Sequence, residues 1–400
     1  MFSSRTQWNM VPNQLSDLLA AKRLRGEVII DLTESNPTRC GISYPEKEIL
    51  AALADESSLL YQPEPRGLPI ARKAIADYYA TLGVTVKPEH IVLTAGTSEA
   101  YSFLFKLLCN AGDEIITPQP SYPLFEYLCQ LNDVTLRHYY LAYDGEWHID
   151  FESLQSAFTE RTRAIVLVHP NNPTGSYLKQ HEFERVCASA AEYNCVIIAD
   201  EVFQPYSFFH DARHANILAQ QSSVLLFSLN GISKLLGLPQ LKLSWIVVCG
   251  HPKQTTGTLD RLDIIADTFL SVNTPAQVAL PKLFGHSQFI GEQIRMRVRS
   301  NFYLLQKAFT DSRASVFHVE GGWYAILQLP QFHNGEEWAV ELLHQQNILV
   351  HPGHFFDMKQ KSCIVLSLLP TSEFFADALS RIRLFVEQLQ PSSSRADRVI

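Results

Sequence analysis

Lys234 stands among isoleucine and leucine residues, where a solvated lysine is not expected. Apolar runs at residues 224–228 and 243–249 predict two buried strands, and the lysine lies on an irregular connection between them. Loss of hydration there would lower the pKa of the amine toward neutrality. A neutral amine attacks aldehydes, which is the condition for forming a Schiff base. The competing interpretation is an ordinary loop lysine in solvent.

Small and polar residues follow the strand predicted at residues 91–94. The sequence Thr-Ala-Gly-Thr-Ser-Glu-Ala at 94–100 opens a predicted helix, and its centre is Gly96, Thr97 and Ser98. Free backbone N–H groups and the positive end of a helix dipole suit a phosphate at such a place. The alternative is an ordinary turn with Ser98 as the N-cap residue.

Three further side chains follow predicted strands. Tyr122 lies in a proline-rich loop, where a rigid ring could stack on a planar ligand or simply pack in the core. Asn172 opens an Asn-Pro-Thr-Gly turn, and its amide could donate to a ligand oxygen. Asp200 ends an apolar strand, where a cationic ring nitrogen would be a suitable partner for its carboxylate. A capping or ion-paired aspartate is the alternative.

The elements that would position these residues alternate along the chain. Strands are predicted at 91–94, 114–117, 134–138, 164–169, 195–199, 224–228 and 243–249, and helices at 14–24, 69–82, 98–109, 123–131 and 179–193. Short apolar strands separated by helices indicate an α/β fold, a three-layer sandwich with a mostly parallel central sheet. Such sheets bind ligands at the carboxyl ends of their strands.

The pattern changes toward the C-terminus. We expect a long helix at 274–309, strands at 315–319, 323–329, 348–351 and 363–368, helices at 336–346 and 373–388, and a frayed tail from 391. We assign residues 46–299 to a large domain. Residues 1–45 and 300–400 form a smaller α+β domain.

Composition narrows the classes of function. A net charge of -8 argues against nucleic acid or an anionic membrane as the main partner. Seven cysteines without a C-x-x-C pair are typical of a reducing compartment and predict neither disulfides nor a metal site. The start lacks the profile of a signal peptide, and no apolar run is long enough to span a membrane. We therefore expect a soluble cytoplasmic protein.

In chain order, these features match the requirements of one molecule, pyridoxal 5'-phosphate. The chain resembles the class I/II aminotransferases of the aspartate aminotransferase fold (fold type I) over nearly its whole length. The resemblance rests on the motifs at residues 61–69, 96–100, 172–175, 200–201, 233–234 and 350–353.

The resemblance implies a role for each residue. Lys234 would hold the cofactor as an internal aldimine and shuttle a proton between the substrate Cα and C4' of the cofactor. Asp200 would keep the pyridine nitrogen protonated. Tyr122 would stack on the ring, and Asn172 would bond the phenolate oxygen.

The resemblance also implies a phosphate site and a dimer. The phosphate would bind Gly96, Thr97, Ser98, Ser233 and Lys242. Tyr61 would reach the phosphate of the neighbouring subunit, so a homodimer with shared sites is implied. The turn at Asn36 would border the substrate, as would Asn172.

Four positions depart from the pattern of the family. Lys242 replaces an arginine that pairs with the phosphate. The positive charge remains, but the planar, forked guanidinium group is lost, so the geometry of phosphate binding should change. Gly231 replaces a phosphate-binding serine or threonine, which leaves Ser233 or Ser228 as candidates. Phe203 replaces a tyrosine that bonds the phenolate oxygen, so the pKa of the aldimine should rise.

The fourth departure concerns the substrate carboxylate. Val365 stands where the family has an arginine that clamps this group. Loss of the arginine–carboxylate contact would remove roughly 2–5 kcal/mol of substrate-binding free energy unless another cation substitutes. Arg39 is the candidate substitute, and a plain surface role is the alternative. Otherwise, the substrate is not an ordinary α-amino acid.

We favour a pyridoxal-phosphate-dependent aminotransferase that moves an amino group from an amino acid or amine to a 2-oxo acid through pyridoxamine phosphate. A C–S β-lyase or a racemase would share Lys234 and Asp200. A non-catalytic sensor would need a DNA-binding domain, for which the N-terminus leaves no room. A nucleotide-binding Rossmann enzyme is disfavoured because no G-x-G-x-x-G follows the first strand.

Overall fold

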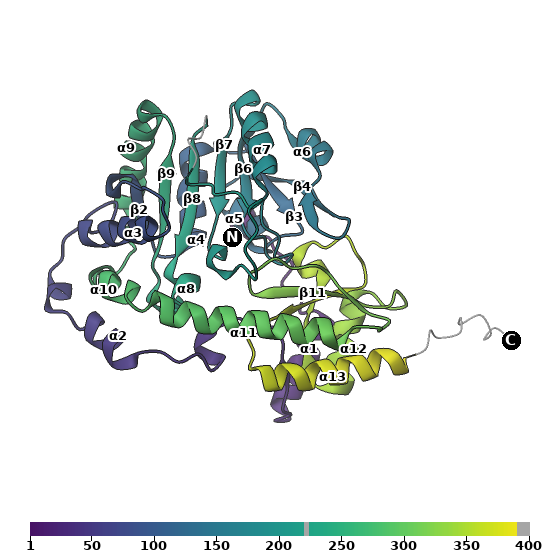
Figure 1. Cartoon of the computed structure of the whole chain (residues 1–400). Coiled ribbons are helices and arrows are strands. Elements are labelled where there is room, and N and C mark those ends of the chain that lie inside the picture. Colours follow the sequence, from purple (N-terminus) through teal and green to yellow (C-terminus); the bar gives the residue numbers. More distant parts are fainter. Residues whose placement is uncertain (220–223, 390–400) are drawn as a thin grey trace.

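The computed structural model describes residues 1–219 and 224–389. Its centre is an eight-stranded sheet (Figure 1). In spatial order the strands are β2 (Ile91–Thr94), β9 (Ser244–Cys249), β8 (Leu226–Gly231), β7 (Val196–Asp200), β6 (Thr162–Val168), β3 (Glu114–Gln119), β4 (Thr135–Tyr143) and β5 (Trp147–Ile149). β9 is antiparallel to both of its neighbours and β5 is antiparallel to β4, whereas the other pairs are parallel. The prediction of a mostly parallel sheet is confirmed.

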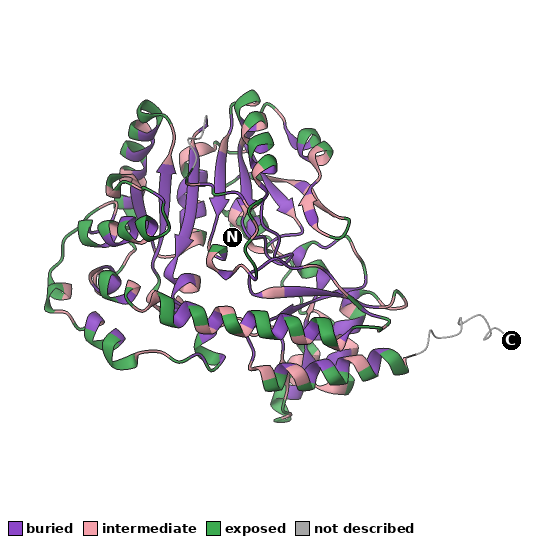
Figure 2. Cartoon of the chain, in the orientation of Figure 1, coloured by how far each residue is buried: buried purple, intermediate pink, exposed green. Residues whose placement is uncertain are grey.

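Successive residues of each central strand are apolar because both faces of the sheet are covered. In β7, Ile198 packs with one layer of helices, whereas Ile197 and Ala199 pack with the other. The first layer includes α4 (Thr97–Leu108), α5 (Leu124–Leu131) and α9 (Pro252–Phe269); the second includes α6 (Phe151–Ala157) and α7 (Gln180–Glu192). Strands β8 and β9 are buried along almost all of their length in Figure 2, whereas β4 near the edge is only partly buried. Helices α2 (Glu46–Leu53), α3 (Pro69–Thr81) and α10 (Thr274–Phe284) cover the β2 end.

A smaller antiparallel sheet lies beside the large one. Its order is β10 (Ser315–Val316), β11 (Tyr324–Gln328), β14 (Cys363–Ser367) and β13 (His351–Pro352). Strand β1 (Ile30–Asp31) pairs in parallel with β12 (Ile348–Leu349), which joins the N-terminal segment to the C-terminal part. The helices packed around this part are α1 (Gln14–Leu24), α11 (Ser287–Ala308), α12 (Gly335–Gln346) and α13 (Ser372–Gln388). The domain boundaries stay a prediction, and α11 crosses the position expected at 299 as one continuous helix.

Three predictions about secondary structure are wrong. The single helix expected at 274–309 is two helices, α10 and α11, which are separated at Gly285 and His286. Lys234 lies on a one-turn helix, α8 (Ile232–Leu235), and not on irregular chain. The strand expected at 348–351 is interrupted at Val350, so that its two halves pair with different strands. The described helices include none with both the length and the apolar character needed to cross a bilayer.

Candidate active site

Lys234 and Asp200 lie at the ends of two neighbouring parallel strands. Asp200 is the last residue of β7, and Lys234 follows β8 on helix α8. Loss of hydration lowers the pKa of Lys234 to about 8, although the Asp200 carboxylate favours the charged amine. A substantial fraction of this amine is therefore neutral near physiological pH, which makes it a nucleophile.

The carboxylate of Asp200 is buried and held by neutral donors. Burial raises its pKa to about 6, opposed by hydrogen bonds from Val202 and Tyr101 and by the charge of Lys234. The N–H of Val202 donates to Oδ1 at 3.2 Å, and the hydroxyl of Tyr101 donates to Oδ2 at 3.0 Å. The acid is thus oriented and available to pair with a cationic group of a ligand.

Aromatic rings surround the amine of Lys234. Its Nζ lies 4.8 Å from the ring centroid of Trp323 and 5.5 Å from that of Phe203. The hydroxyl of Tyr206 donates to the Lys234 carbonyl oxygen at 2.6 Å and so fixes the backbone of α8. Sequence reasoning missed Trp323 and Tyr206. The only signal in the sequence was the Gly-Gly-Trp-Tyr run at 321–324, where a strand is predicted to begin. This run does not indicate where that strand lies in the fold.

The start of helix α4 is suited to an anion. Gly96 is the N-cap residue and no side chain caps the helix, so the alternative of Ser98 as the N-cap is wrong. A Cβ atom placed on Gly96 would lie 3.7 Å from Nζ of Lys242. The ammonium of Lys242 therefore lies near Gly96 at the positive end of the helix, whose first residues are Thr97 and Ser98.

Asn172 and Tyr122 lie on loops at the same end of the sheet. Asn172 is buried, and its Oδ1 has no hydrogen-bond partner among the described residues. A buried acceptor without a donor is unfavourable, and a bound ligand could supply that donor. Tyr122 is partly exposed, and both burial and the charge of Asp200 raise the pKa of its hydroxyl, which places it near that carboxylate.

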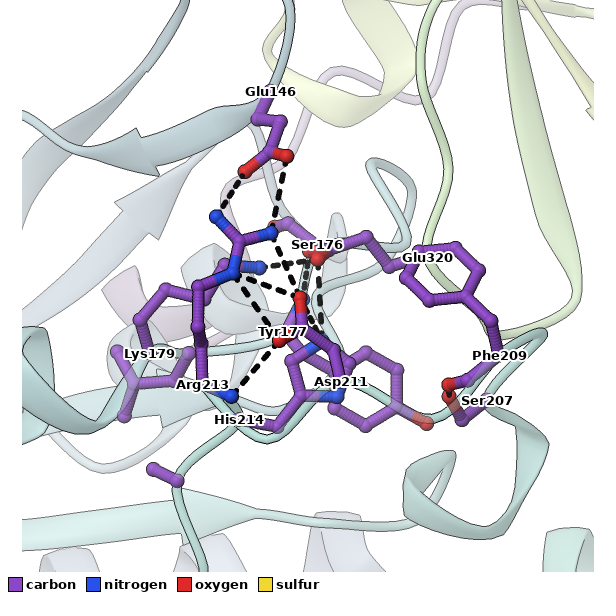
Figure 3. A network of polar contacts seen from close by, with 12 residues as sticks. Glu146, Ser176, Tyr177, Lys179, Ser207, Phe209, Asp211, Arg213, His214 and Glu320 are labelled. Atoms are coloured by element: carbon purple, nitrogen blue, oxygen red, sulfur yellow. Dashed lines mark hydrogen bonds and ion pairs between the residues drawn. The ribbon is translucent and has the colours of Figure 1, made fainter.

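A polar network fixes the loop that carries Asn172 (Figure 3). Glu320 accepts the N–H of Tyr177 at 2.8 Å, and its own N–H donates to the carbonyl of Gly175 at 3.2 Å. Its carboxylate also forms a buried ion pair with Lys179 and lies 3.2 Å from Nε2 of His214. The network joins the Asn172 loop to the segment that leads into Trp323.

Asp211, His214 and Glu320 lie close enough together to hold a metal ion. Arg213 pairs with Asp211, and Lys179 pairs with Glu320, so the two carboxylates already have cationic partners. Figure 3 shows both cations directed into the network. We therefore interpret the cluster as structural.

Several predicted residues border this centre, whereas others do not. The turn at Asn36 packs near α8, because a Cβ atom on Gly237 would lie 3.3 Å from Cβ of Pro37. Ser233 is half-buried on α8. Tyr61 is 73% exposed, and Arg39 points to solvent with its guanidinium 3.8 Å from Glu34.

The departures from the family pattern have clear structural settings. Val365 is fully buried in an apolar cluster with Trp147, Phe317 and Phe356. The hydroxyl of Ser228 donates to Oε2 of Glu201 at 2.6 Å, so it is already engaged. Phe203 is buried and packs edge-on against Trp323.

Comparison with known proteins identifies the family of the chain. A family model described as "Aminotransferase class I and II" matches residues 27–382. The chain is 27% identical to "Glutamate-pyruvate aminotransferase AlaA" of Escherichia coli (strain K12), covering 92% of this chain and 93% of the relative.

Solved structures share the fold. An aminotransferase from Escherichia coli superposes with a TM-score of 0.84 at 26% identity and covers 97% of this chain and 98% of its own. An alanine aminotransferase from Pyrococcus furiosus gives a TM-score of 0.87 at 24% identity, with 97% and 100% covered. The similarity therefore extends over both sheets.

Proposed function

The chain belongs to the class I and II aminotransferase family and is an aminotransferase, and from this premise we propose that it binds pyridoxal 5'-phosphate between Lys234 and Asp200. The observation that carries this proposal is the pairing of a lysine of lowered pKa, about 8, with a buried carboxylate at the ends of neighbouring strands. Both groups face the same end of the sheet as the N-terminus of α4.

The side chains present fit this cofactor. The buried Oδ1 of Asn172 lacks a donor, the free N-terminus of α4 with Lys242 suits a phosphate, and Asp200 suits a protonated pyridine nitrogen. When bound, pyridoxal 5'-phosphate supplies an aldehyde that condenses with amines and a ring that takes up electron density from the substrate.

The residues of the chain would act on protons and orientation. Lys234 would provide the amine that holds the aldehyde of the cofactor, and the same amine would move the proton of the substrate Cα. Asp200, oriented by Tyr101, holds the proton on the pyridine nitrogen. Trp323 and Phe203 exclude water around the amine.

We propose that the donors are amino acids and the acceptors 2-oxo acids, with alanine and glutamate the first donors to test. The names of the relatives support this choice, since they are glutamate-pyruvate and alanine aminotransferases. Because Val365 lies in an apolar cluster, an amino acid donor would need a cation elsewhere to hold its carboxylate.

The test uses purified protein loaded with pyridoxal 5'-phosphate. Alanine or glutamate should change the absorption band of the cofactor, and a 2-oxo acid should restore it. Borohydride reduction followed by peptide mass spectrometry should label Lys234, and Lys234→Ala should abolish turnover. Turnover by Lys234→Ala with any amino donor would overturn the proposal, and release of pyruvate and ammonia without an acceptor would indicate a lyase.

We also propose a cytoplasmic homodimer. All seven cysteines are free, which is consistent with a reducing compartment. Exposed apolar side chains gather around Tyr61, namely Leu59 and Leu60, as expected for a segment that a second subunit covers. Sedimentation of the loaded protein tests the dimer, and a monomer that retains full activity would contradict shared sites.

A further inference from the structure

One hydroxyl fills the space of a missing side chain between strands β8 and β9. Gly231 and Ser244 are direct partners in the antiparallel ladder. A Cβ atom placed on Gly231 would lie 2.2 Å from Oγ of Ser244, far closer than two such atoms can approach. The side chain of Ser244 therefore occupies the position that any larger residue at 231 would need.

No described residue forms a hydrogen bond with the hydroxyl of Ser244. Ser244 itself is 1% exposed. A hydroxyl that no protein group bonds keeps its hydrogen available for a ligand.

Ser244 lies at the same end of the sheet as the N-terminus of α4. It pairs with Thr94, the last residue of β2, and the hydroxyl of Thr94 donates to the carbonyl of Gly96 at 3.1 Å. Lys242, two residues before Ser244, has its ammonium beside Gly96. A helix N-terminus, an ammonium and an unused hydroxyl thus meet at one place.

We propose that Ser244 donates its hydroxyl hydrogen to the phosphate of the cofactor, beside Lys242 and the first N–H groups of α4. This inference rests on the proposed function. A lysine supplies charge to a phosphate without fixing its orientation, and a hydroxyl on a rigid strand adds a directed donor. Ser228 is excluded because it bonds Glu201, which leaves Ser233 as the competitor.

The first experiment separates the phosphate from the rest of the cofactor. Dissociation constants of the apoprotein for pyridoxal 5'-phosphate and for pyridoxal, which has no phosphate, are measured by fluorescence. Ser244→Ala should weaken binding of the phosphorylated form about tenfold, the loss of one hydrogen bond to a charged group, and leave pyridoxal unchanged. The ³¹P resonance of the bound cofactor should also shift.

Matched variants complete the test. For each variant we compare the ratio of the dissociation constants for pyridoxal 5'-phosphate and pyridoxal. In Ser233→Ala this ratio should stay closer to the wild-type ratio than in Ser244→Ala. Gly231→Ser should weaken binding because its Cβ meets Ser244. The exchange Gly231→Ser with Ser244→Gly returns one hydroxyl to the same space from the opposite strand, and it should recover most of the lost affinity.

The outcomes are distinguishable. Wild-type protein that fails to bind pyridoxal 5'-phosphate would overturn the proposed function itself. If wild type binds it and Ser244→Ala binds it equally well, only the role of Ser244 is wrong. Equal weakening of both ligands by Ser244→Ala, or an exchange variant no better than Ser244→Ala, would also contradict that role.

Discussion

The hydroxyl of Tyr101, on helix α4, donates a hydrogen bond across 3.0 Å to Oδ2 of Asp200 at the end of strand β7. A neutral donor stabilises the buried carboxylate without neutralising it. The carboxylate therefore keeps its charge for a cationic partner. The free energy needed to ionise this buried acid, and hence its pKa, depends on Tyr101.

The first prediction concerns the acid limb of the activity profile. Burial raises the pKa of Asp200 to about 6, so its charged form is lost as the pH falls through that value. A cationic ring nitrogen beside the carboxylate would lower this pKa, so we expect kcat/KM to fall on the acid side at or below about pH 6. Tyr101→Phe removes a donor to the charged form and should move this limb upward by about one pH unit. Rates measured from pH 5 to 9 test this, with Tyr127→Phe as a surface control, and an unmoved limb in Tyr101→Phe would be inconsistent with it.

The second prediction concerns the stability of the apoprotein. The folded-state pKa of Lys234 lies below its ordinary value, so the unfolded chain binds more protons between about pH 8 and the ordinary lysine pKa. Lys234 therefore destabilises the fold below about pH 8, and this penalty decreases as the pH rises above that value.

Lys234→Met should raise the melting temperature of the apoprotein at pH 7 by a few degrees, which corresponds to about 1 kcal/mol. The gap between variant and wild type should narrow at pH 10. Lys253→Met, at an exposed position of α9, is the control. It should change the melting temperature neither at pH 7 nor at pH 10. A variant that melts below wild type at pH 7 would show that the amine is well solvated.

The third prediction concerns the network around Glu320. Glu320→Gln leaves the buried ammonium of Lys179 without its charged partner, and it should lower the free energy of unfolding by about 3–5 kcal/mol. Arg213→Ala, which removes a half-exposed partner, should lower it by less than about 1 kcal/mol. Urea unfolding measures both. Similar losses for the two variants would mean that Glu320 does not anchor the Asn172 loop.

Much of the sheet could be predicted because strands that are buried on both faces leave continuous apolar runs in the sequence. Asp200, Asn172 and Gly96 were identified for the same reason, since Asp200 ends such a run and the other two lie on the loops that follow one. Their proximity in space then follows from parallel strands whose carboxyl ends lie at one end of the sheet.

Other features depend on contacts that no local pattern encodes. Trp323 reaches Lys234 from the smaller sheet, and Ser244 meets Gly231 through the register of β8 with β9. Helix α9 was missed because the residues at 255–258, Thr-Thr-Gly-Thr, are poor helix formers, and packing of its apolar face onto the sheet overrides their propensity.

The last prediction concerns the substrate carboxylate. Val365 is fully buried among aromatic rings, so an arginine introduced there would be a buried charge without a partner acid and should destabilise the protein. The cation must come from elsewhere. Arg39 lies on the loop whose Ser35 lies near Tyr324, a residue packed against Phe203 beside Lys234.

Arg39→Ala should therefore raise KM for the amino donor about tenfold or more and change kcat less, because a charge-assisted bond to the carboxylate is lost on binding. Glu34→Gln should lower KM, since Glu34 competes for the same guanidinium. Arg25→Ala removes an exposed arginine that pairs with Glu27 and should leave KM unchanged. If Arg39→Ala and Arg25→Ala behave alike with every amino acid tested, the substrate is held by contacts other than an arginine clamp, and donors without a carboxylate become the next to examine.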